Sequence, residues 1–356
     1  MDSINTGVQH HILLLLSVPP TVKRTYLPAA DGIRALACLL VLFVHNTAIV
    51  FPRTDRYLIG CGKIGVWLFF VLSAYLLTQQ FIARGFSRRE LAGYAMSRFL
   101  RIYPAYAAAV IAYSWVGTLG INEKSDLIAA LTLQSGVGHL WTIPVEFKFY
   151  LVLPLLSFAA VLASRRFGSS GVVLLSLLLI ILHQLFFPYF QLPGNSISTA
   201  WHLSCFQFGI CAAFISKSVS ARTSNILGYS VLATILLSTP LARSLIFGIP
   251  PAPYLLNKYL WFGFLWVIFI VAIVNLREPT ALANILKSGP LRVIGRWSFS
   301  IYLCHWYFAI KASERYPENP WAMIASLLLA IGFGALMFYA IERPLLLLKK
   351  RIQKEF

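Results

Sequence analysis

The sequence predicts an all-α protein, a polytopic transmembrane helix bundle with about ten spans and both termini in the cytoplasm. Three observations support this fold class. Of the 356 residues, 58% are hydrophobic and only 12% are charged, a composition too apolar for a soluble globular domain. The hydrophobic residues gather in runs of about 20, the length that crosses a bilayer core. The Lys and Arg residues lie in short clusters between those runs.

Ten apolar runs follow one another along the chain. They cover residues 30–50, 64–83, 102–120, 140–163, 171–190, 199–216, 225–242, 258–276, 293–311 and 321–342. These runs divide the chain into an N-terminal cytoplasmic segment (1–29), a membrane domain (30–345) and a short basic cytoplasmic tail (346–356). No connection is long enough to hold a folded domain. We therefore expect the chemistry to lie within the membrane or at its two faces.

The positive charges follow the predicted topology. With the N-terminus inside, twenty Lys and Arg residues fall in the inner segments and eight in the outer ones, as the positive-inside rule requires. The net charge of +18 thus reflects topology and contact with lipid headgroups, and we exclude nucleic acid as a partner. The five cysteines lie mostly in apolar runs without zinc-ligand spacing, so we expect no metal site. The predicted location is the plasma (inner) membrane.

The first run carries two ionisable residues, Arg34 near its start and His45 near its end. Eleven helical residues separate them, which is about three turns and roughly 16 Å on one face of the helix. Ionisable groups within a span are costly and usually line a substrate path or form a buried pair, so this polar face is a candidate site. As alternatives, His45 ties two helices together by a hydrogen bond, and Arg34 reaches the headgroups.

A pair of arginines, Arg98 and Arg101, precedes the third run. Their spacing of three residues places both guanidinium groups on one helix face at the cytoplasmic mouth. Guanidinium groups bind phosphate oxygens bidentately, so the pair is a candidate site for a phosphate-rich ligand. The alternative is anchoring to lipid headgroups.

A carboxylate, Glu146, lies at the start of the fourth run, where Pro144 suits a first helical turn. Lys148 is two residues away and faces the other side of the helix, so it cannot be the partner of Glu146. We expect Glu146 near the outer interface, away from the paired arginines. Structural pairing with another helix and substrate binding both remain open.

The ninth run holds a polar stripe of Ser298, Tyr302 and His305 at positions i, i+4 and i+7. These residues are candidates for lining an internal pore, and interhelical hydrogen bonding is the alternative. The tenth run ends at Glu342-Arg343-Pro344, which predicts that the helix stops there.

Together these segments resemble the acyltransferase-3 family of integral-membrane acyltransferases. The similar segments are Asp31-Gly-Ile-Arg-Ala-Leu-Ala with His45, Arg98-Phe-Leu-Arg-Ile-Tyr-Pro, Leu140-Trp-Thr-Ile-Pro-Val-Glu-Phe-Lys-Phe-Tyr, Ser298 to Trp306, and Glu342-Arg-Pro. They occur in the family's order across almost the whole chain. The chain departs from the family pattern at Pro144, Lys148 and Tyr307, which are often serine, glutamine and proline in the family.

The resemblance implies transfer of an acyl group, acetyl in many members, from cytosolic acyl-CoA to a hydroxyl of a glycan or lipid-linked sugar at the outer face. Arg98 and Arg101 would hold the CoA phosphates, and Arg34 would contact CoA or stabilise negative charge on the thioester oxygen. His45 would act as the general base, and Glu146 would orient the acceptor. Acyl-CoA is then a donor substrate, and no permanently bound cofactor is expected.

Two other classes of protein fit the ten runs. A transporter or flippase of a lipid-linked saccharide needs buried Arg, His and Glu residues but no acyl-CoA. A catalytically silent scaffold would tolerate loss of His45. Transfer of label from acetyl-CoA separates both from an acyltransferase. The sequence alone identifies neither the acceptor nor a protein partner.

Overall fold

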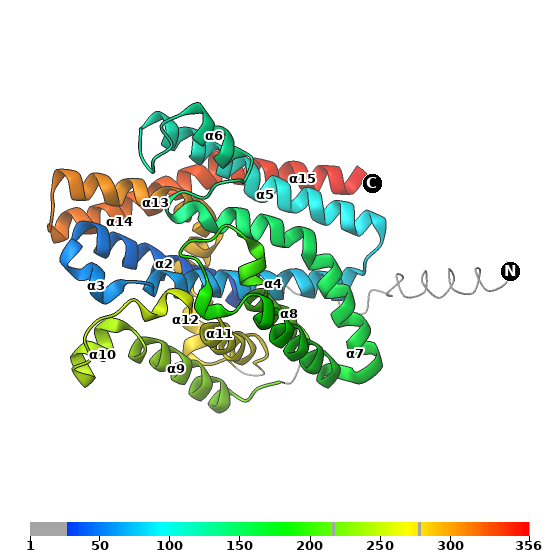
Figure 1. Ribbon diagram of the computed structural model, residues 1–356. Helices are drawn as coiled ribbons and strands as arrows, with labels where there is room; N and C mark the ends of the chain where they lie inside the picture. The colour runs from blue at the N-terminus through cyan, green and yellow to red at the C-terminus, as the bar shows by residue number, and fades with distance from the viewer. Residues whose placement is uncertain (1–26, 216–217, 277–278, 356) are drawn as a thin grey trace.

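The computed structural model describes residues 27–215, 218–276 and 279–355, with side chains as far as residue 349. This part of the chain is helical, and its only β-type pairing is an isolated bridge between Val219 and Leu276. The predicted all-α class is therefore confirmed (Figure 1). Most of the predicted N-terminal segment lies outside the described residues. The same holds for Lys217 and Arg277, two of the positive charges counted in the inner segments.

The helices follow one another with short connections. The longer ones are α2 (Pro28–Val50), α4 (Cys61–Arg84), α5 (Arg88–Trp115), α7 (Thr142–Phe186), α8 (Leu203–Ala212), α9 (Ala221–Leu237), α11 (Tyr259–Val274), α13 (Gly289–Arg315), α14 (Pro320–Met337) and α15 (Arg343–Glu355). The shorter ones are α3 (Asp55–Leu58), α6 (Lys124–Leu131), α10 (Pro240–Phe247) and α12 (Ala281–Leu286). Six short turns complete the set: η1 (Pro52–Thr54), η2 (Gly138–Trp141), η3 (Tyr189–Gln191), η4 (Thr199–His202), η5 (Tyr254–Asn257) and the π-helical turn η6 (Phe338–Glu342).

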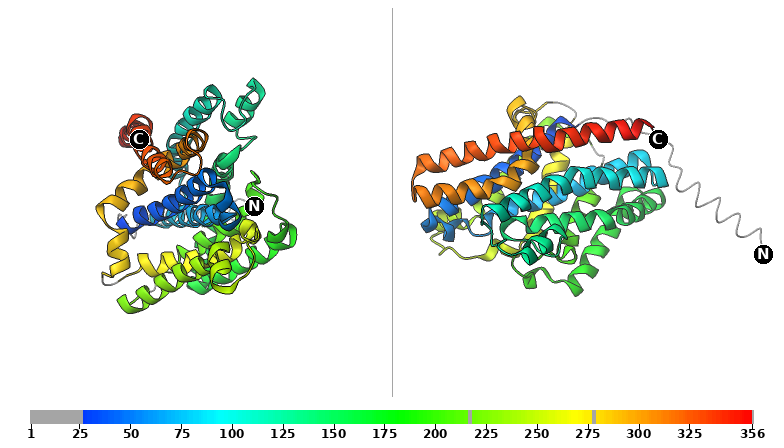
Figure 2. Two further views of the ribbon diagram at one scale, coloured as in Figure 1. Left: turned by 90° about the vertical axis from the view of Figure 1, so that its left-hand side faces the viewer. Right: turned by 90° about the horizontal axis from the view of Figure 1, so that it is seen from above.

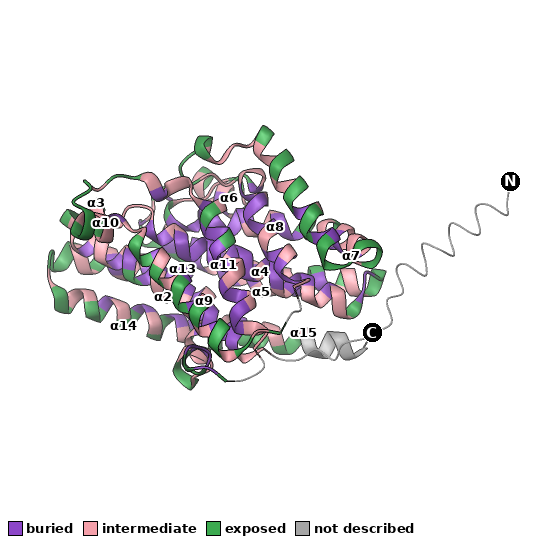
Figure 3. Cartoon of the chain, turned by 90° about the horizontal axis from the view of Figure 1, so that it is seen from below, coloured by how far each residue is buried: buried purple, intermediate pink, exposed green. Residues whose placement is uncertain are grey.

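The helices α2, α4 and α13 form the centre of the bundle. Helix α2 packs against α13 and α4, and α4 in turn packs against α8 and α11. Small buried side chains such as Ala35, Ala37 and Cys38 on α2 and Ser298 on α13 allow close packing. The outer surfaces of α7, α9 and α14 carry exposed large apolar side chains, and Figure 3 shows the buried residues gathered along the central helices. A surface this apolar fits a lipid environment.

Four described helical segments are long and apolar enough to cross a membrane. They are Pro28–Val50, Cys61–Arg84, Gly138–Phe186 and Pro320–Lys349, and a bent pair formed by α9 and α10 would make a fifth. Helix α11 is strongly apolar but shorter. A membrane protein is thus indicated, whereas ten spans and cytoplasmic termini remain predictions.

Two of the predicted spans are joined by a kink and not by a loop. The runs 140–163 and 171–190 lie in α7, which consists of two helical segments that meet at a kink at Gly168. This glycine adopts φ 66° and ψ −162°, a conformation open to glycine because it has no Cβ, and α7 changes direction near its midpoint (Figure 1). Arg165 and Arg166 consequently lie in helix and not in a connecting loop.

The seventh predicted span, 225–242, is broken. Helix α9 ends at Leu237, and α10 leaves at an angle of 79°. Thr239 caps the new helix by accepting a hydrogen bond from the backbone N–H of Ala242, and Pro240 occupies the first helical turn. A proline with a capping residue before it starts a helix, so the run cannot continue as one straight segment.

The predicted helix stop at Pro344 is wrong. Helix α14 passes through η6 into α15, which reaches Glu355. Pro344 is the second residue of α15, where the widened π turn immediately before it helps to accommodate a residue without an N–H. The predicted basic tail is therefore helical as far as residue 355, and Figure 2 shows this long C-terminal helix beside α5.

Candidate active site

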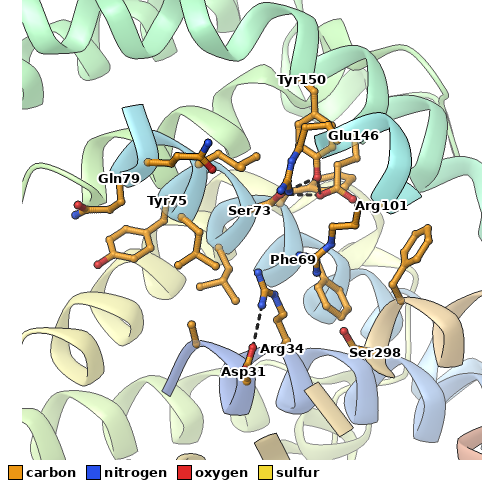
Figure 4. A pocket seen from close by; sticks show the side chains of 18 of the residues that line it. Asp31, Arg34, Phe69, Ser73, Tyr75, Gln79, Arg101, Glu146, Tyr150 and Ser298 are labelled. Carbon is orange, nitrogen blue, oxygen red and sulfur yellow. Dashed lines mark hydrogen bonds and ion pairs between the residues drawn. The ribbon is translucent and has the colours of Figure 1, made fainter. Parts of the chain in front are cut away.

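A cavity of about 510 Å³ lies among α2, α4, α5, α7, α11 and α13. The helices bring together residues that are far apart in the chain, including Asp31 and Arg34, Ser73, Arg98 and Arg101, Glu146 and Tyr150, and Ser298 and Tyr302. Figure 4 shows side chains from α2, α4, α5 and α7 pointing toward this common space. Arg34 thus lines the same cavity as Arg98 and Arg101, the pair predicted to bind a phosphate-rich ligand.

The helix α5 begins earlier than the sequence suggested, and this placement carries its arginines to the cavity. Ser87 caps the helix by accepting a hydrogen bond from the backbone N–H of Glu90, which satisfies one of the donors left free at a helix start. Arg98 and Arg101 therefore lie within the helix. Because they are three residues apart, they share one face, and both line the cavity.

Two of the cavity's arginines, Arg34 and Arg98, have different environments. Arg34 forms an ion pair with Asp31 at 3.0 Å. Arg98 donates to the hydroxyl of Ser97 at 3.1 Å and lies 5.9 Å from the ring centre of Tyr150, and within the described part of the chain its buried Nε has no hydrogen-bond partner. These residues leave guanidinium N–H groups able to donate to a ligand.

The cavity carries an excess of positive charge. Four arginines and two carboxylates line it, which leaves a formal excess of two positive charges. The electrostatic field of these lining residues favours an anion. Guanidinium groups are suited to phosphate oxygens in particular.

Glu146 lies in the same cavity as the arginines. Its Oε1 accepts hydrogen bonds from the hydroxyl of Ser73 at 2.7 Å and from the hydroxyl of Tyr150. None of the ion pairs between described residues includes Glu146. The expectation that Glu146 lies away from the paired arginines is therefore wrong. Helix α7 places Glu146 inside the bundle beside α4 and α5, where two hydroxyl groups donate hydrogen bonds to its carboxylate.

The end of the cavity nearest the histidines is formed by Tyr302 and Thr142. The Thr142 hydroxyl donates to the Tyr302 hydroxyl at 3.0 Å, and Tyr302 donates to the backbone carbonyl of His139. The Tyr302 ring lies 5.3 Å from that of His139 and 5.6 Å from that of His305, between ring centres. Tyr302 therefore contacts both the cavity and the histidine cluster described next.

Three histidines meet beside this tyrosine. His45 Nδ1 lies 2.9 Å from His305 Nε2, and the His139 ring lies 4.7 Å from that of His305. Trp306 stacks on His139 at 5.3 Å and meets His45 edge-on at 4.9 Å. His139 and His305 are buried and His45 is half-buried. We call His45, His139 and His305 the histidine cluster.

The predicted polar stripe of α13 is divided between these two places. Ser298 and Tyr302 line the cavity, whereas His305, one turn further along, belongs to the histidine cluster. His45 does not line the cavity either. The predicted residues thus fall into an arginine cavity and a histidine cluster that adjoin at Tyr302.

His139 is a residue of the site that the sequence patterns did not indicate. The structure places it in η2, only 2% exposed, with Nε2 at 3.2 Å from the carbonyl of Leu303. Within the described residues its Nδ1 has no hydrogen-bond partner. A single histidine in a short turn has no periodic pattern, so only its position directly before Leu140-Trp141 could have drawn attention to it.

The arrangement suits acid–base chemistry next to an anion site. A buried imidazole without a carboxylate partner is favoured in its neutral form, which accepts a proton at one nitrogen. An anionic ligand in the arginine cavity could extend past Tyr302 toward that imidazole.

Comparison with known proteins identifies relatives along most of the chain. Residues 27–340 match the family model Acyl_transf_3, described as an acyltransferase domain. The O-acetyltransferase OatA of Staphylococcus aureus (strain NCTC 8325 / PS 47) is 26% identical over 368 residues, which cover 90% of this chain and 57% of OatA. A putative O-acetyltransferase of S. aureus strain COL is 25% identical over 361 residues, which cover 90% of this chain and 58% of that protein. No solved structure matches. This chain therefore spans a little over half the length of these relatives.

Proposed function

We propose that this chain, which belongs to the acyltransferase-3 family and is an acyltransferase, transfers an acetyl group from acetyl-CoA to a hydroxyl of a glycan or lipid-linked sugar. The observation that carries the proposal is the arrangement of Arg34, Arg98 and Arg101 around one cavity that ends beside the histidine cluster. An anion site and a neutral imidazole are the two parts that such a reaction needs.

The donor would bind with its phosphates among the arginines. Arg98 and Arg101 lie on one helix face and can each offer two N–H groups to phosphate oxygens. Arg34 lies three turns from His45 on the continuous helix α2, about 16 Å along the axis. Of the two roles expected for Arg34, this distance favours contact with CoA over contact with the thioester oxygen. The pantetheine arm would extend along α2 past Tyr302.

The Glu146 carboxylate would contact the donor. Both described hydrogen bonds reach Oε1, so Oε2 can accept one from an N–H or O–H group of the pantetheine arm. This role replaces the acceptor-side role expected from the sequence, because the carboxylate shares the cavity with the arginines.

His45 would be the general base. As the acceptor hydroxyl oxygen attacks the thioester carbonyl, the imidazole takes the hydroxyl proton, and a tetrahedral intermediate forms. The C–S bond then breaks, the imidazolium returns the proton to the leaving sulfur, and free CoA and the acetyl ester result. Proton transfer by a positioned side chain contributes about 10²–10⁴-fold to the rate.

The acceptor would approach the histidine cluster from the side opposite the arginines, at the outer face of the plasma membrane. This placement follows from the predicted topology, in which the start of α2 is cytoplasmic. The names of the matched relatives, which are O-acetyltransferases, support a hydroxyl oxygen as the acceptor atom.

The test measures the transfer of radiolabel from acetyl-CoA to glycan by the purified protein in a lipid bilayer. Wild-type protein should label the glycan, and His45→Ala should lower turnover by about 10²–10⁴-fold with unchanged acetyl-CoA affinity. Retention of near-normal turnover by His45→Ala would refute the general-base role. Export of unmodified saccharide without label transfer would instead support a transporter.

A further inference from the structure

A chain of two hydrogen bonds links His45 to the backbone of α13. His305 Nδ1 lies 2.7 Å from the carbonyl oxygen of Tyr302, and His305 Nε2 lies 2.9 Å from His45 Nδ1. The two imidazole planes differ by only 10°, and their centres are 5.3 Å apart. With the nitrogens so much closer than the ring centres, the rings lie end to end, which aligns an N–H with an in-plane lone pair.

These contacts determine where the hydrogens lie. A carbonyl oxygen can only accept, so His305 Nδ1 must carry the hydrogen that it donates to Tyr302. The ion pairs of the described residues include neither histidine, and an unpaired imidazolium in so buried a place is unfavourable. His305 is therefore neutral, and its Nε2 accepts. His45 Nδ1 must then donate, and the lone pair lies on His45 Nε2, to which none of the described residues donates a hydrogen bond.

The free nitrogen of His45 faces a glycine. A Cβ placed on Gly62, in the first turn of α4, would lie 2.8 Å from His45 Nε2. This is closer than a carbon and a nitrogen normally approach, so the absence of a side chain at Gly62 keeps space beside the basic nitrogen. The acceptor hydroxyl needs this space in order to deliver its proton.

We infer that His305 is a positioning residue that holds His45 in the tautomer with hydrogen on Nδ1 and the basic lone pair on Nε2, and that Gly62 keeps the approach to Nε2 open. This inference rests on the proposed role of His45 as general base. His305 acts through His45 and exchanges no proton with the substrate. Its role corresponds to that of the third residue in a nucleophile–base–orienter arrangement.

The kinetic test compares two variants of His305. His305→Ala removes the acceptor for His45 Nδ1–H, and we expect kcat to fall about 10- to 100-fold, the loss typical of a partner that orients an imidazole, with unchanged KM for acetyl-CoA. His305→Gln offers an amide oxygen in place of Nε2 and should recover most of the loss. His183→Gln is the matched control, because His183 bonds to Ser204 and the carbonyl of Ala200 in a separate network. Equal activity of the Ala and Gln variants would overturn the inference.

The spectroscopic test reads the tautomer directly. In ¹⁵N-histidine-labelled protein in bilayers, the signals lost in His45→Ala belong to His45. They should show a protonated Nδ1 and an unprotonated Nε2 in the wild type, and a mixture of tautomers in His305→Ala. A mixture already present in the wild type, or one tautomer unchanged in His305→Ala, would refute the positioning role whether or not His45 is the base.

The steric test uses Gly62. Gly62→Ala should lower kcat at least tenfold while the acetyl-CoA affinity stays unchanged, because the added Cβ occupies the space beside His45 Nε2. Gly332→Ala on α14 is the control, because a Cβ there meets no atom within 4 Å. Normal turnover of Gly62→Ala would show that the acceptor does not use this space. If His45→Ala is itself active, the proposed function fails, and the tautomer measurement still decides the geometry.

Discussion

Replacing Arg98 or Arg101 by lysine should weaken acetyl-CoA binding while keeping the charge. Both side chains line the cavity from one face of α5, and lysine loses the planar fork that donates two parallel hydrogen bonds to a phosphate. A hydrogen bond to a charged group contributes about 1.5–3 kcal/mol. Loss of one such bond raises the Kd roughly 10- to 100-fold.

The assay is calorimetric titration of the purified protein in nanodiscs with acetyl-CoA and, separately, with acetyl-pantetheine, which lacks the phosphates. The Arg98→Lys and Arg101→Lys variants should lose affinity for acetyl-CoA and bind acetyl-pantetheine as the wild type does. Arg166→Lys is the control, since Arg166 is exposed on α7 and does not line the cavity. Unchanged acetyl-CoA affinity in both α5 variants would refute the phosphate role and leave only headgroup anchoring.

Three further predictions follow from the site and the charge distribution. Glu146→Gln keeps an oxygen that accepts from Ser73 and Tyr150 but loses the negative charge. The KM for acetyl-CoA should therefore rise several-fold with little change in thermal stability. Normal donor binding with lost acetyl transfer would instead support the acceptor-side role. Tyr302→Phe leaves the His139 carbonyl and the Thr142 hydroxyl without their partner, and thermal unfolding should show destabilisation of about 1–3 kcal/mol; an unchanged unfolding temperature would contradict this. Reporter fusions in the 85–87 connection between α4 and α5 should report a cytoplasmic location, and an external location would refute the topology.

The sequence predicted those parts of the site that depend on one helix. Arg34 and His45 are joined by α2, and Arg98 and Arg101 by one face of α5, so helical spacing alone placed each pair. The polar stripe of α13 likewise lies toward the interior of the bundle. The all-α class followed from the apolar runs, because unpaired backbone groups are excluded from lipid.

The rest of the site depends on packing between helices, which no local pattern specifies. His45 and His305 are 260 residues apart and meet because α2 packs on α13. Glu146 lies beside the arginines because α7 lies against α4 and α5. The kink within α7 and the bend after α9 show that apolar runs alone do not define helix ends, which are set by residues such as Gly168 and Thr239.

The central claim is that a donor bound by the arginines delivers its thioester to His45. Bromoacetyl-CoA tests this claim directly, because an imidazole nitrogen held beside the acyl group displaces bromide and becomes covalently labelled. We predict that peptide mass spectrometry will locate the label on His45, that excess acetyl-CoA will prevent labelling, and that Arg101→Lys will slow it at low reagent concentration. Labelling only of cysteines or of sites outside the histidine cluster, unaffected by acetyl-CoA, would contradict the account.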